Sequence, residues 1–243
     1  MSYHNRDLAA YGSDLAAEYA AAVLATSPIA YWKMNEGTGT AIVDSSVNAL
    51  TNGTYTGITW SSGSGRFGAS VPLFDGVNDF GSVLSAALSS AIDLDEGFAF
   101  VWVKVDAAFW TDGANRYFLS FRIDSNNFVG FLKASVNNTL QYSRVGSGTT
   151  KFQQVAGFSY TNWFCVGVSW SIANDHFKMY VNGVQVGTTQ TGNIAVTGSS
   201  LSIANIGAVT STPAQPFAGR LESAVLYDTP VLSGSDARLA LMI

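Results

Sequence analysis

The acidic side chains of this sequence are the first place to look for catalysis. Enzymes that cleave sugars from a β-strand use two carboxylates at alternate positions, so that both point into the same cleft. The glutamates of the chain are Glu18, Glu36, Glu96 and Glu222. None of them has a partner at that spacing. The densest acidic group, Asp93-x-Asp95-Glu96, precedes an aromatic run and is typical of a solvated turn. A hydrolase that depends on this group is the least favoured function.

The sequence also lacks the patterns of a histidine-based catalytic or zinc site and of a glycine-rich phosphate-binding loop. His4 and His176 are far apart in the sequence, whereas a catalytic triad or a zinc site needs histidine beside further functional groups. The stretch Gly146-Ser147-Gly148 lacks the lysine and the strand-loop-helix context of a phosphate-binding loop. The sequence therefore predicts no enzyme activity and no required cofactor.

Loop aromatics offer a different chemistry, the binding of sugars. Aromatic rings stack on sugar rings, while polar side chains contact the hydroxyl groups. Trp60, Trp110 and Tyr160 flank loops and are the candidates for such a site. The alternative is that these rings plug the ends of the fold. The other tryptophans lie in strand-like runs and are predicted to be core residues: Trp32, Trp102, Trp163 and Trp170.

The composition limits the scaffold that can position these residues. Of 243 residues, 47% are hydrophobic and only 12% are charged, so a large core and a weakly charged surface are expected. The net charge is -5, and the basic residues are scattered rather than clustered, which argues against nucleic acid as a partner. Cys165 is the only cysteine and lies in an apolar run, which predicts a buried thiol and excludes an internal disulfide.

The N-terminal stretch does not have the pattern of a secretory signal. Asp14 and Glu18 interrupt its alanine-rich run, and no basic region precedes it. Nowhere does the sequence approach the run of about 18 apolar residues that spans a membrane. We expect synthesis in a cytoplasm and no membrane insertion.

Residues 13–25 are the one segment with a clear helical pattern, with Ser13 or Asp14 as the N-cap. The residues predicted to share its apolar face are Leu15, Tyr19 and Val23. So short a helix is marginal alone in water, so its apolar face should dock, either on the rest of the same chain or on another subunit. Residues 1–28 would then form an arm, and residues 29–243 a single domain.

After residue 28, short apolar runs alternate with Gly, Ser, Thr, Asn and Asp clusters, which is typical of many short strands. The clearest case is residues 176–186, where Asn182-Gly183 predicts a type I′ hairpin. Phe177, Met179 and Val181 should face the core together. The other predicted strands are residues 29–34, 71–74, 98–105, 117–123, 128–134 and 140–145. Together they predict an antiparallel sandwich of about a dozen strands.

Six motifs occur along the chain in the order of one known family. They are the aromatic pair, Glu-x-x-Gly and Asp-Ser turn within residues 30–46, and residues 74–80, 98–104, 163–168, 180–183 and 217–233. Through them, residues 30–243 resemble LamG-like jelly-roll domains of the concanavalin A-like lectin/glucanase class. The resemblance implies an all-β, two-sheet antiparallel jelly-roll sandwich. Phe80 replaces the family's usual Tyr, and Glu222 its usual Asp, which puts in doubt any metal role at position 222.

The resemblance adds one expected ion. LamG-like folds often hold calcium at a sheet rim with carboxylates and loop carbonyls, which suit a hard cation. It implies Asp75 and Asp79 as ligands, with Asp44 behind them. The alternative is that Asp75, Gly76 and Asn78 are simply good turn formers.

Residues 19–32 add a second resemblance, to the leader that often precedes this domain in bacteriophage structural proteins. The favoured function is therefore a non-catalytic virion protein, a capsid decoration or tail-associated subunit. Its partners would be other virion proteins or copies of itself, with host-surface glycans as a further ligand. The alternative is a stand-alone carbohydrate-binding or adhesion module.

Overall fold

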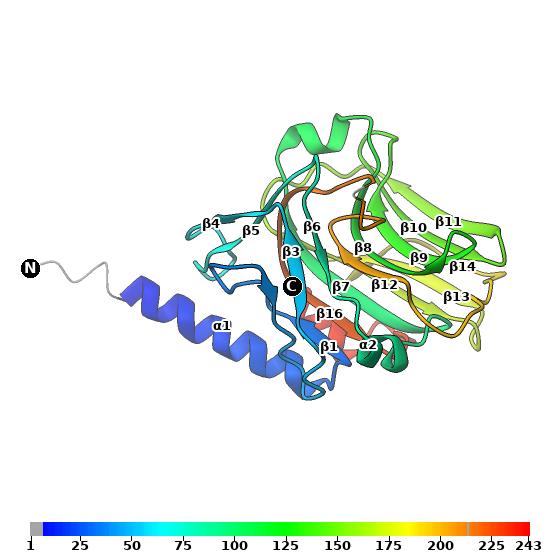
Figure 1. Cartoon of the computed structure of the whole chain (residues 1–243), viewed down its shortest axis with the longest axis horizontal. Helices are drawn as coiled ribbons and strands as arrows, with labels where there is room; N and C mark the ends of the chain where they lie inside the picture. Colours follow the sequence, from blue (N-terminus) through cyan, green and yellow to red (C-terminus); the bar gives the residue numbers. More distant parts are fainter. Residues whose placement is uncertain (1–6, 213) are drawn as a thin grey trace, which may run out of the picture.

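Two antiparallel sheets of eight strands each pack face to face and form the body of the molecule (Figure 1). The computed structural model describes residues 7–212 and 214–243, and only the backbone of residues 7–11. His4 therefore lies outside the described residues. The two-sheet sandwich with one N-terminal helix confirms the fold class that the sequence predicts.

The first sheet, sheet A, has the spatial order β14 (Val184–Gln190), β13 (His176–Val181), β12 (Phe164–Ser171), β7 (Glu96–Lys104), β16 (Ala218–Tyr227), β5 (Val71–Asp75) and β4 (Thr59–Ser61), and β1 (Ala30–Trp32) also pairs with β16. Sheet B has the order β11 (Thr149–Ala156), β10 (Thr139–Gly146), β9 (Asn127–Lys133), β8 (Arg116–Asp124), β15 (Ile203–Ile206), β6 (Phe80–Ser82), β3 (Gly53–Thr56) and β2 (Ala41–Ile42). Neighbours in space are often distant in sequence, as expected for a jelly roll.

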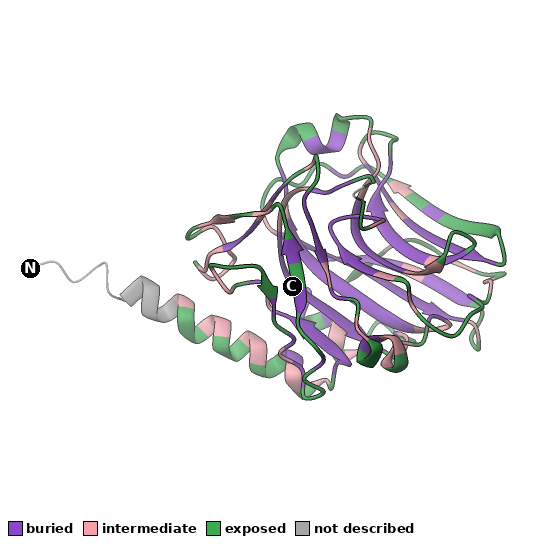
Figure 2. Cartoon of the chain, viewed as in Figure 1, coloured by how far each residue is buried: buried purple, intermediate pink, exposed green. Residues whose placement is uncertain are grey.

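Alternation along the strands builds the main core between the sheets. In β7, Ala99, Val101 and Val103 point inward and belong to this core. Phe98, Phe100 and Trp102 point to the opposite, outer face of sheet A, as the two-residue period of a strand requires. Both sets are buried, so β7 is purple along most of its length in Figure 2, whereas the edge strand β14 is mostly exposed.

The outer face of sheet A is buried because the two ends of the chain cover it. Helix α1 (Asp7–Ala25) and the C-terminal segment, which includes α3 (Ala237–Ala240), pack against its aromatic side chains. Towards its N-terminal end α1 runs away from the sandwich (Figure 1). None of the helices in the described residues is long and apolar enough to cross a membrane.

Among the described residues, the buried apolar cluster on the outer face of sheet B is small and consists of Tyr117, Leu132 and Val209. The buried residues of α1 and α3 belong to the cluster on sheet A, and those of α2 (Ala86–Ala91) and of the 3-10 helix η1 (Ala107–Thr111) belong to the core between the sheets. No described helix therefore packs against this outer face.

Several predicted elements need correction. Helix α1 begins at Asp7, so Ser13 and Asp14 lie inside it and neither is its N-cap. Helices α2 and α3 were not predicted, because they depend on caps rather than on a periodic apolar face: the side chain of Ser85 accepts from the Leu88 N–H at 3.0 Å, and that of Asp236 from the Arg238 N–H at 3.0 Å. The described residues form sixteen strands rather than about a dozen.

The predicted hairpin is confirmed. Asn182 and Gly183 both have positive φ angles, 47° and 75°, as a type I′ turn requires. Phe177, Met179 and Val181 all belong to the core between the sheets. The Asn-Gly turn and the alternation of apolar residues were sufficient to predict this hairpin from the sequence.

Candidate functional site

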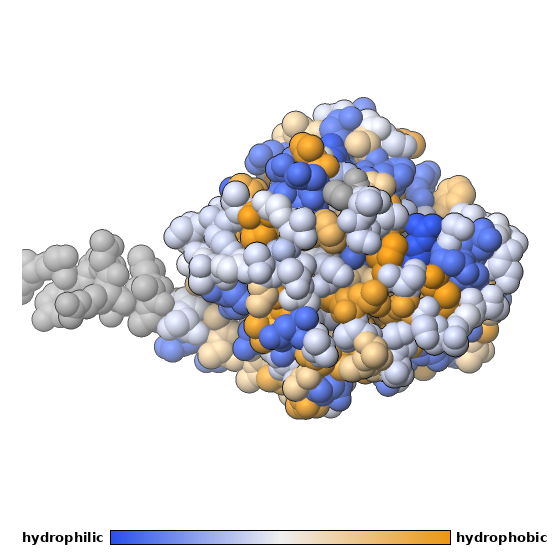
Figure 3. Space-filling model, viewed as in Figure 1, coloured by the Kyte–Doolittle hydropathy of each residue, from blue (hydrophilic) through white to orange (hydrophobic). Residues whose placement is uncertain are grey.

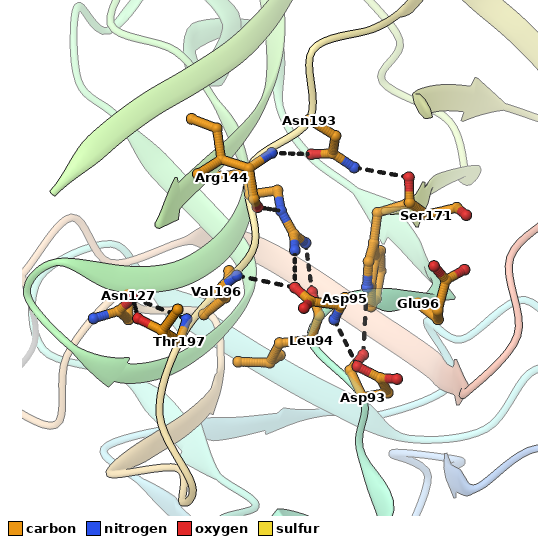
Figure 4. Close-up of polar contacts among 12 residues, drawn as sticks. Asp93, Leu94, Asp95, Glu96, Asn127, Arg144, Ser171, Asn193, Val196 and Thr197 are labelled. Atoms are coloured by element: carbon orange, nitrogen blue, oxygen red, sulfur yellow. Dashed lines mark hydrogen bonds and ion pairs between the residues drawn. The ribbon is translucent and has the colours of Figure 1, made fainter. Parts of the chain in front are cut away.

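The acidic group Asp93-x-Asp95-Glu96 lies between α2 and the start of β7 in the chain, and an arginine from sheet B meets Asp95 there (Figure 4). In β10, Leu140, Tyr142 and Arg144 alternate inward and are all buried. A charged guanidinium thus occupies a position that strand alternation reserves for the core. Such a group is tolerated only when its charge is paired and its donors are satisfied.

Arg144 meets both conditions through two segments that are remote in sequence. Its Nη2 group donates to the Asp95 carboxylate, Nη1 to the Leu94 carbonyl and Nε to the Ile194 carbonyl. Figure 4 shows the guanidinium directed at Leu94 and Asp95. One buried side chain therefore joins β10, the entry to β7 and the irregular segment that precedes β15.

That irregular segment, residues 193–202, is held by further side chains. The Val196 N–H donates to Asp95 Oδ1 at 2.9 Å, the Thr197 N–H to Asn127 Oδ1 at 3.0 Å and the Leu201 N–H to Ser89 Oγ at 2.8 Å. A segment without regular secondary structure is thus fixed at several points. Loops of this kind, ordered on a rigid scaffold, are where proteins place binding residues.

Between α2 and this segment the surface forms two adjoining hollows, of about 220 Å³ and about 380 Å³, which share Ser89, Ser199, Ser200 and Leu201. We call the two together the serine hollow. Its other lining residues are Leu84, Ser85, Ala86, Ser90, Ile92, Asp93, Leu94, Asp95, Ile123, Val196 and Gly198. Sites for small ligands are typically of roughly this size, 300 to 1,000 Å³.

The lining of the serine hollow combines oxygen atoms with aliphatic side chains. Serine hydroxyls lie on both walls, and the side chain of Asp95 is 35% exposed, so its carboxylate faces solvent while it holds Arg144. Hydroxyl and carboxylate oxygens suit a polyhydroxylated ligand, and the aliphatic residues suit its C–H faces. The carboxylates disfavour an anionic ligand because like charges repel.

The same geometry bears on catalysis. Each carboxylate of the predicted acidic turn already accepts a backbone N–H: Asp93 from Asp95 at 2.7 Å, Asp95 from Val196 at 2.9 Å and Glu96 from Ala173 at 2.8 Å. Interpretation of this group as merely a solvated turn was wrong for Asp95, because that residue neutralises an arginine 49 positions later. Its role is to hold backbone segments together.

The predicted sugar-stacking residues are not brought together. Trp110 is 1% exposed and donates its indole N–H to the Tyr160 carbonyl at 2.7 Å, so it is a core residue with no face for a sugar. Trp60 is half-buried, packs edge-on against Tyr55 and donates to the Gly39 carbonyl at 3.1 Å. Tyr160 is 45% exposed and stacks on Phe164 at 5.3 Å between ring centroids.

None of these three rings lines the serine hollow. The alternative, that such rings plug the ends of the sandwich, describes Trp110 fully and Trp60 in part. Of the four tryptophans predicted to be in the core, Trp32, Trp102 and Trp170 are buried, while Trp163 is half-buried.

The predicted calcium ligands act as turn formers. Asp75 Oδ1 accepts the N–H groups of Val77 and Asn78, at 2.7 and 3.2 Å, and Asp79 Oδ2 accepts the Asp75 N–H at 2.8 Å. Burial raises the pKa of Asp79. Asp44 accepts three backbone N–H groups, from Tyr31, Ser46 and Leu50.

Within the described part of the chain, no group of three or more His, Cys, Asp or Glu side chains is placed to hold a metal ion. Asp75 does line a further hollow of about 370 Å³ together with Asp106 and Asp112. Asp112, however, is paired with Arg116 at 2.7 Å and with Lys133 at 2.6 Å. Asp75 and Asp79 thus have the turn-forming role of the alternative, and calcium binding at these positions stays a prediction.

The predicted arm face docks on the sandwich of its own chain. Val23 is fully buried, Leu15 is half-buried, and Tyr19 accepts the Trp102 indole N–H at 2.9 Å while it donates to the Leu241 carbonyl at 3.1 Å. The Arg66 guanidinium lies 3.2 Å from the ring centroid of Trp102 and 4.7 Å from that of Tyr19. Burial raises the pKa of Tyr19 well above its usual range.

Sequence reasoning missed Arg144 and the residues that it organises. One signal was present: Arg144 follows Leu140 and Tyr142 at the two-residue period of core positions. The identity of its partner was not accessible, because Asp95 and Ile194 lie about 50 residues away on either side. The serine wall at residues 198–200 looked like any exposed turn.

A family model described as the concanavalin A-like lectin/glucanases superfamily matches residues 86–236, which is more than half of the chain. The matched region contains Arg144 and all lining residues of the serine hollow except Leu84 and Ser85. No curated protein sequence matches the chain.

Solved structures resemble the chain at low sequence identity. Domain 4 of AbnA, a GH43 extracellular arabinanase from Geobacillus stearothermophilus solved with arabinotriose, has a TM-score of 0.66 at 17% identity and covers 89% of this chain and 98% of its own. The CBM40 of Ruminococcus gnavus IT-sialidase, bound to α2,3-sialyllactose, has a TM-score of 0.52 at 13% identity, covering 63% and 85%. The binding domain of Paraclostridial Mosquitocidal Protein 1 reaches 0.66 at 10%, covering 90% and 52%. At these identities the likeness shows a shared fold.

Proposed function

The chain belongs to the concanavalin A-like lectin/glucanases superfamily, and on that premise we propose that it is a non-catalytic carbohydrate-binding protein whose ligand occupies the serine hollow. The observation that carries the proposal is the buried Arg144, which fixes an irregular, serine-rich segment as one wall of an open hollow. A wall that is ordered before the ligand arrives lowers the entropic cost of binding.

The hydrogen bonds that the carboxylates of the acidic turn accept support a binding role without catalysis. Glycoside hydrolysis needs one carboxyl group to donate a proton and a second to act as nucleophile or base. Asp93, Asp95 and Glu96 are instead used as acceptors for backbone N–H groups and for Arg144. Similar folds that bind arabinotriose and sialyllactose show that the scaffold suits sugars.

The test is to fill the hollow with a larger side chain at a lining residue that is exposed and does not contribute to the core. Ser200 is exposed on its wall, so Ser200→Tyr places a ring in the hollow without disturbing the core. Ser62→Tyr, at an exposed turn between β4 and β5, is the matched control. On a glycan array, with and without calcium, we expect Ser200→Tyr to weaken binding at least tenfold and Ser62→Tyr to leave it unchanged.

Two results would contradict the proposal in different ways. Equal binding by wild type and Ser200→Tyr would place the ligand elsewhere on the protein. A wild-type protein that binds no glycan in either condition would remove the carbohydrate function itself. Both outcomes leave the fold assignment intact.

We further propose that the sandwich is displayed on a bacteriophage virion, with α1 as the element that contacts neighbouring virion proteins or copies of itself. Its inner face is committed to sheet A, but Ala21 and Ala25 are exposed on its outer side. The low content of charged residues also suits packing in an assembly. On the face drawn in Figure 3, areas of intermediate hydropathy lie between smaller hydrophilic and hydrophobic patches.

Intact phage particles from the source lysate provide the measurement. We expect mass spectrometry to detect the chain in purified particles, with hundreds of copies for a head decoration and a handful for a tail subunit. Ala21→Lys with Ala25→Lys should reduce incorporation, because two exposed cations are added and no buried contact is lost. Absence of the wild-type chain from particles would leave the stand-alone binding module as the function.

A further inference from the structure

The strands that end the two sheets differ in length and regularity. In the described part of the chain these strands are β14 and β4 for sheet A and β11 and β2 for sheet B. β4 has three residues and β2 has two, and the register of β13 with β14 shifts between Phe177 and Met179. Short or irregular edges protect a sheet from pairing with other chains. β11, by contrast, has eight residues that pair with β10 without any shift.

The outer edge of β11 carries backbone groups that are free to pair with another strand. Residues 147 and 148 form the turn between β10 and β11 and have positive φ angles of 47° and 78°, so Thr149 makes the hydrogen-bonded pair that closes the hairpin. Hydrogen-bonding direction alternates along a strand. The N–H and C=O groups of Thr150, Phe152 and Gln154 therefore point away from β10, where no strand of the described residues lies.

This edge is open to solvent. Along β11, Gln153 is buried and Val155 is half-buried, while the other residues are exposed (Figure 2). Phe152 is 55% exposed and pairs with Ser143 of β10, on the outer face of sheet B. A long, regular edge strand with an exposed aromatic side chain is a ready template for a further strand.

We propose that β11 is a dimerisation edge, at which two copies of the chain join by antiparallel pairing of their β11 strands. With the two-fold axis at Phe152, residues 149–155 of the two copies lie side by side. Phe152 then faces Phe152 of the second copy, and Thr150 faces Gln154. Each of these facing pairs exchanges two backbone hydrogen bonds, so the interface contains about six of them. Sheet B continues from one copy into the other.

The side chains of β11 favour a second copy as the partner and fix the register. Lys151 is the one charged residue of β11, and with the axis at Phe152 it faces the neutral Gln153 of the second copy. An axis at Lys151 would bring two ammonium groups together, and an axis at Gln153 would place each aromatic ring opposite an amide. The axis at Phe152 avoids like charges and pairs the two rings, which stabilises adjacent strands. The strand is therefore complementary to itself, as a two-fold interface requires.

The dimer goes beyond the proposed carbohydrate function and does not depend on it. No residue of β11 lines the serine hollow, so each copy keeps its own hollow in the dimer. Edge pairing over residues 149–155 gives a small interface, and small interfaces are typical of reversible association. We therefore expect a dimer that dissociates on dilution.

Sedimentation velocity over about a hundredfold range of protein concentration tests the proposal. Wild-type protein should change from monomer to dimer as the concentration rises. Phe152→Lys places two like charges on the axis and should raise the dimer dissociation constant at least tenfold. Val184→Lys, the same added charge at a 67% exposed valine of β14, is the control and should leave the dimer unchanged. Wild-type protein that stays monomeric, or undiminished dimerisation of Phe152→Lys, would overturn the inference.

Disulfide cross-linking tests the register. Cys165 is the only native cysteine and is fully buried, so an introduced surface thiol reacts without interference. In Phe152→Cys the two thiols face each other across the axis with Cα atoms about 5.5 Å apart, which a disulfide can span. In Thr150→Cys they are more than about 13 Å apart. Under mild oxidation, Phe152→Cys should form a covalent dimer and Thr150→Cys should not. A Phe152→Cys protein that cross-links no better than Thr150→Cys would refute pairing about Phe152.

Discussion

The two sheets have the same number of strands and share one core, yet their outer faces differ. On sheet A, Phe98, Phe100 and Trp102 form an aromatic layer that α1 and the C-terminal segment cover completely. On sheet B, the corresponding positions carry serines, an asparagine and few apolar groups, and no described helix covers them. The apolar outer face is buried by the two ends of the chain. On the outer face of sheet B, Ser120, Ser143 and Asn205 are also buried, although no described helix packs there, while Phe152 at its edge is exposed.

This difference explains how one sandwich can be both stable and able to bind. Apolar area that is removed from water stabilises the fold, at about 25 cal/mol for each Å². Polar groups in binding sites contribute little to stability, or reduce it, until a ligand pairs with them. Substitutions on the two faces should therefore act on different quantities.

The largest effect is expected on the covered face. Trp102 is buried beneath α1, where it contacts the Arg66 guanidinium and donates to Tyr19. Trp102→Ala should lower the free energy of unfolding by about 4 kcal/mol, as is usual for loss of a buried tryptophan. Urea denaturation measures it. A change below about 1 kcal/mol would mean that α1 does not depend on this face, and the comparison between the faces would fail.

Arg144 tests the region between the faces. Arg144→Met keeps the apolar stem and removes three hydrogen bonds and an ion pair, so we expect a loss of about 3 kcal/mol. The same variant should lose glycan binding at the serine hollow, because the segment at Ile194 is released. Lys104→Met, on a half-buried lysine of β7 that has no role in the hollow, is the control for the change in composition. Full binding by Arg144→Met would show that the hollow does not need its anchor.

These regions also differ in how far the sequence could predict them. The covered face follows from local patterns: alternation identified the aromatic strand at residues 98–105, and the apolar spacing of Leu15, Tyr19 and Val23 identified the helix that covers it. The choice between docking on the same chain and docking on a neighbour was open. It depends on the match between Tyr19, Trp102 and Arg66, which come from three separate segments.

The outer face of sheet B and the hollow could not be predicted in the same way. Asn205 looks like an ordinary polar residue in a short run, and only the three-dimensional structure shows that it is buried and that its amide has no hydrogen-bond partner among the described residues. Trp110 is the opposite case: it was a candidate for stacking on sugars, and a 3-10 helix turns it inward, as the end-plugging alternative expected. In both cases the burial of the side chain depends on contacts between segments that are distant in the sequence. Composition and the period of apolar residues carry no information about such contacts.

A smaller effect, on pH dependence, is expected at Glu222 under α1. Burial raises the pKa of this carboxyl, although the Arg66 N–H donates to it at 2.8 Å. The folded state therefore binds the proton more tightly than the unfolded state, and wild-type stability falls as pH rises from the ordinary glutamate value to the raised one. Below that window the penalty is absent.

Glu222→Gln removes this dependence and keeps an oxygen for the Arg66 N–H. The stability of Glu222→Gln relative to wild type should therefore rise with pH through the window and stay constant above it. Other carboxyls with raised pKa, such as Glu36, are present in both proteins and cancel in the difference. Chemical denaturation at a series of pH values from 4 to 8 provides the measurement, and a constant difference would show that Glu222 titrates as it does in the unfolded chain.

The smallest effect on stability is expected at Phe152, and it is the sharpest test of the comparison. Phe152 is 55% exposed on the edge strand β11 of sheet B. Phe152→Thr keeps a residue that favours strands and removes little buried area, so the unfolding free energy should change by less than about 0.5 kcal/mol. Glycan binding at the serine hollow should be unchanged, because Phe152 does not line it. An aromatic residue on the outer face of sheet A would then support the fold, and the exposed one at the edge of sheet B would not. A stability loss at Phe152 that approaches the loss at Trp102 would mean that both faces are structural, and the division of roles between them would be wrong.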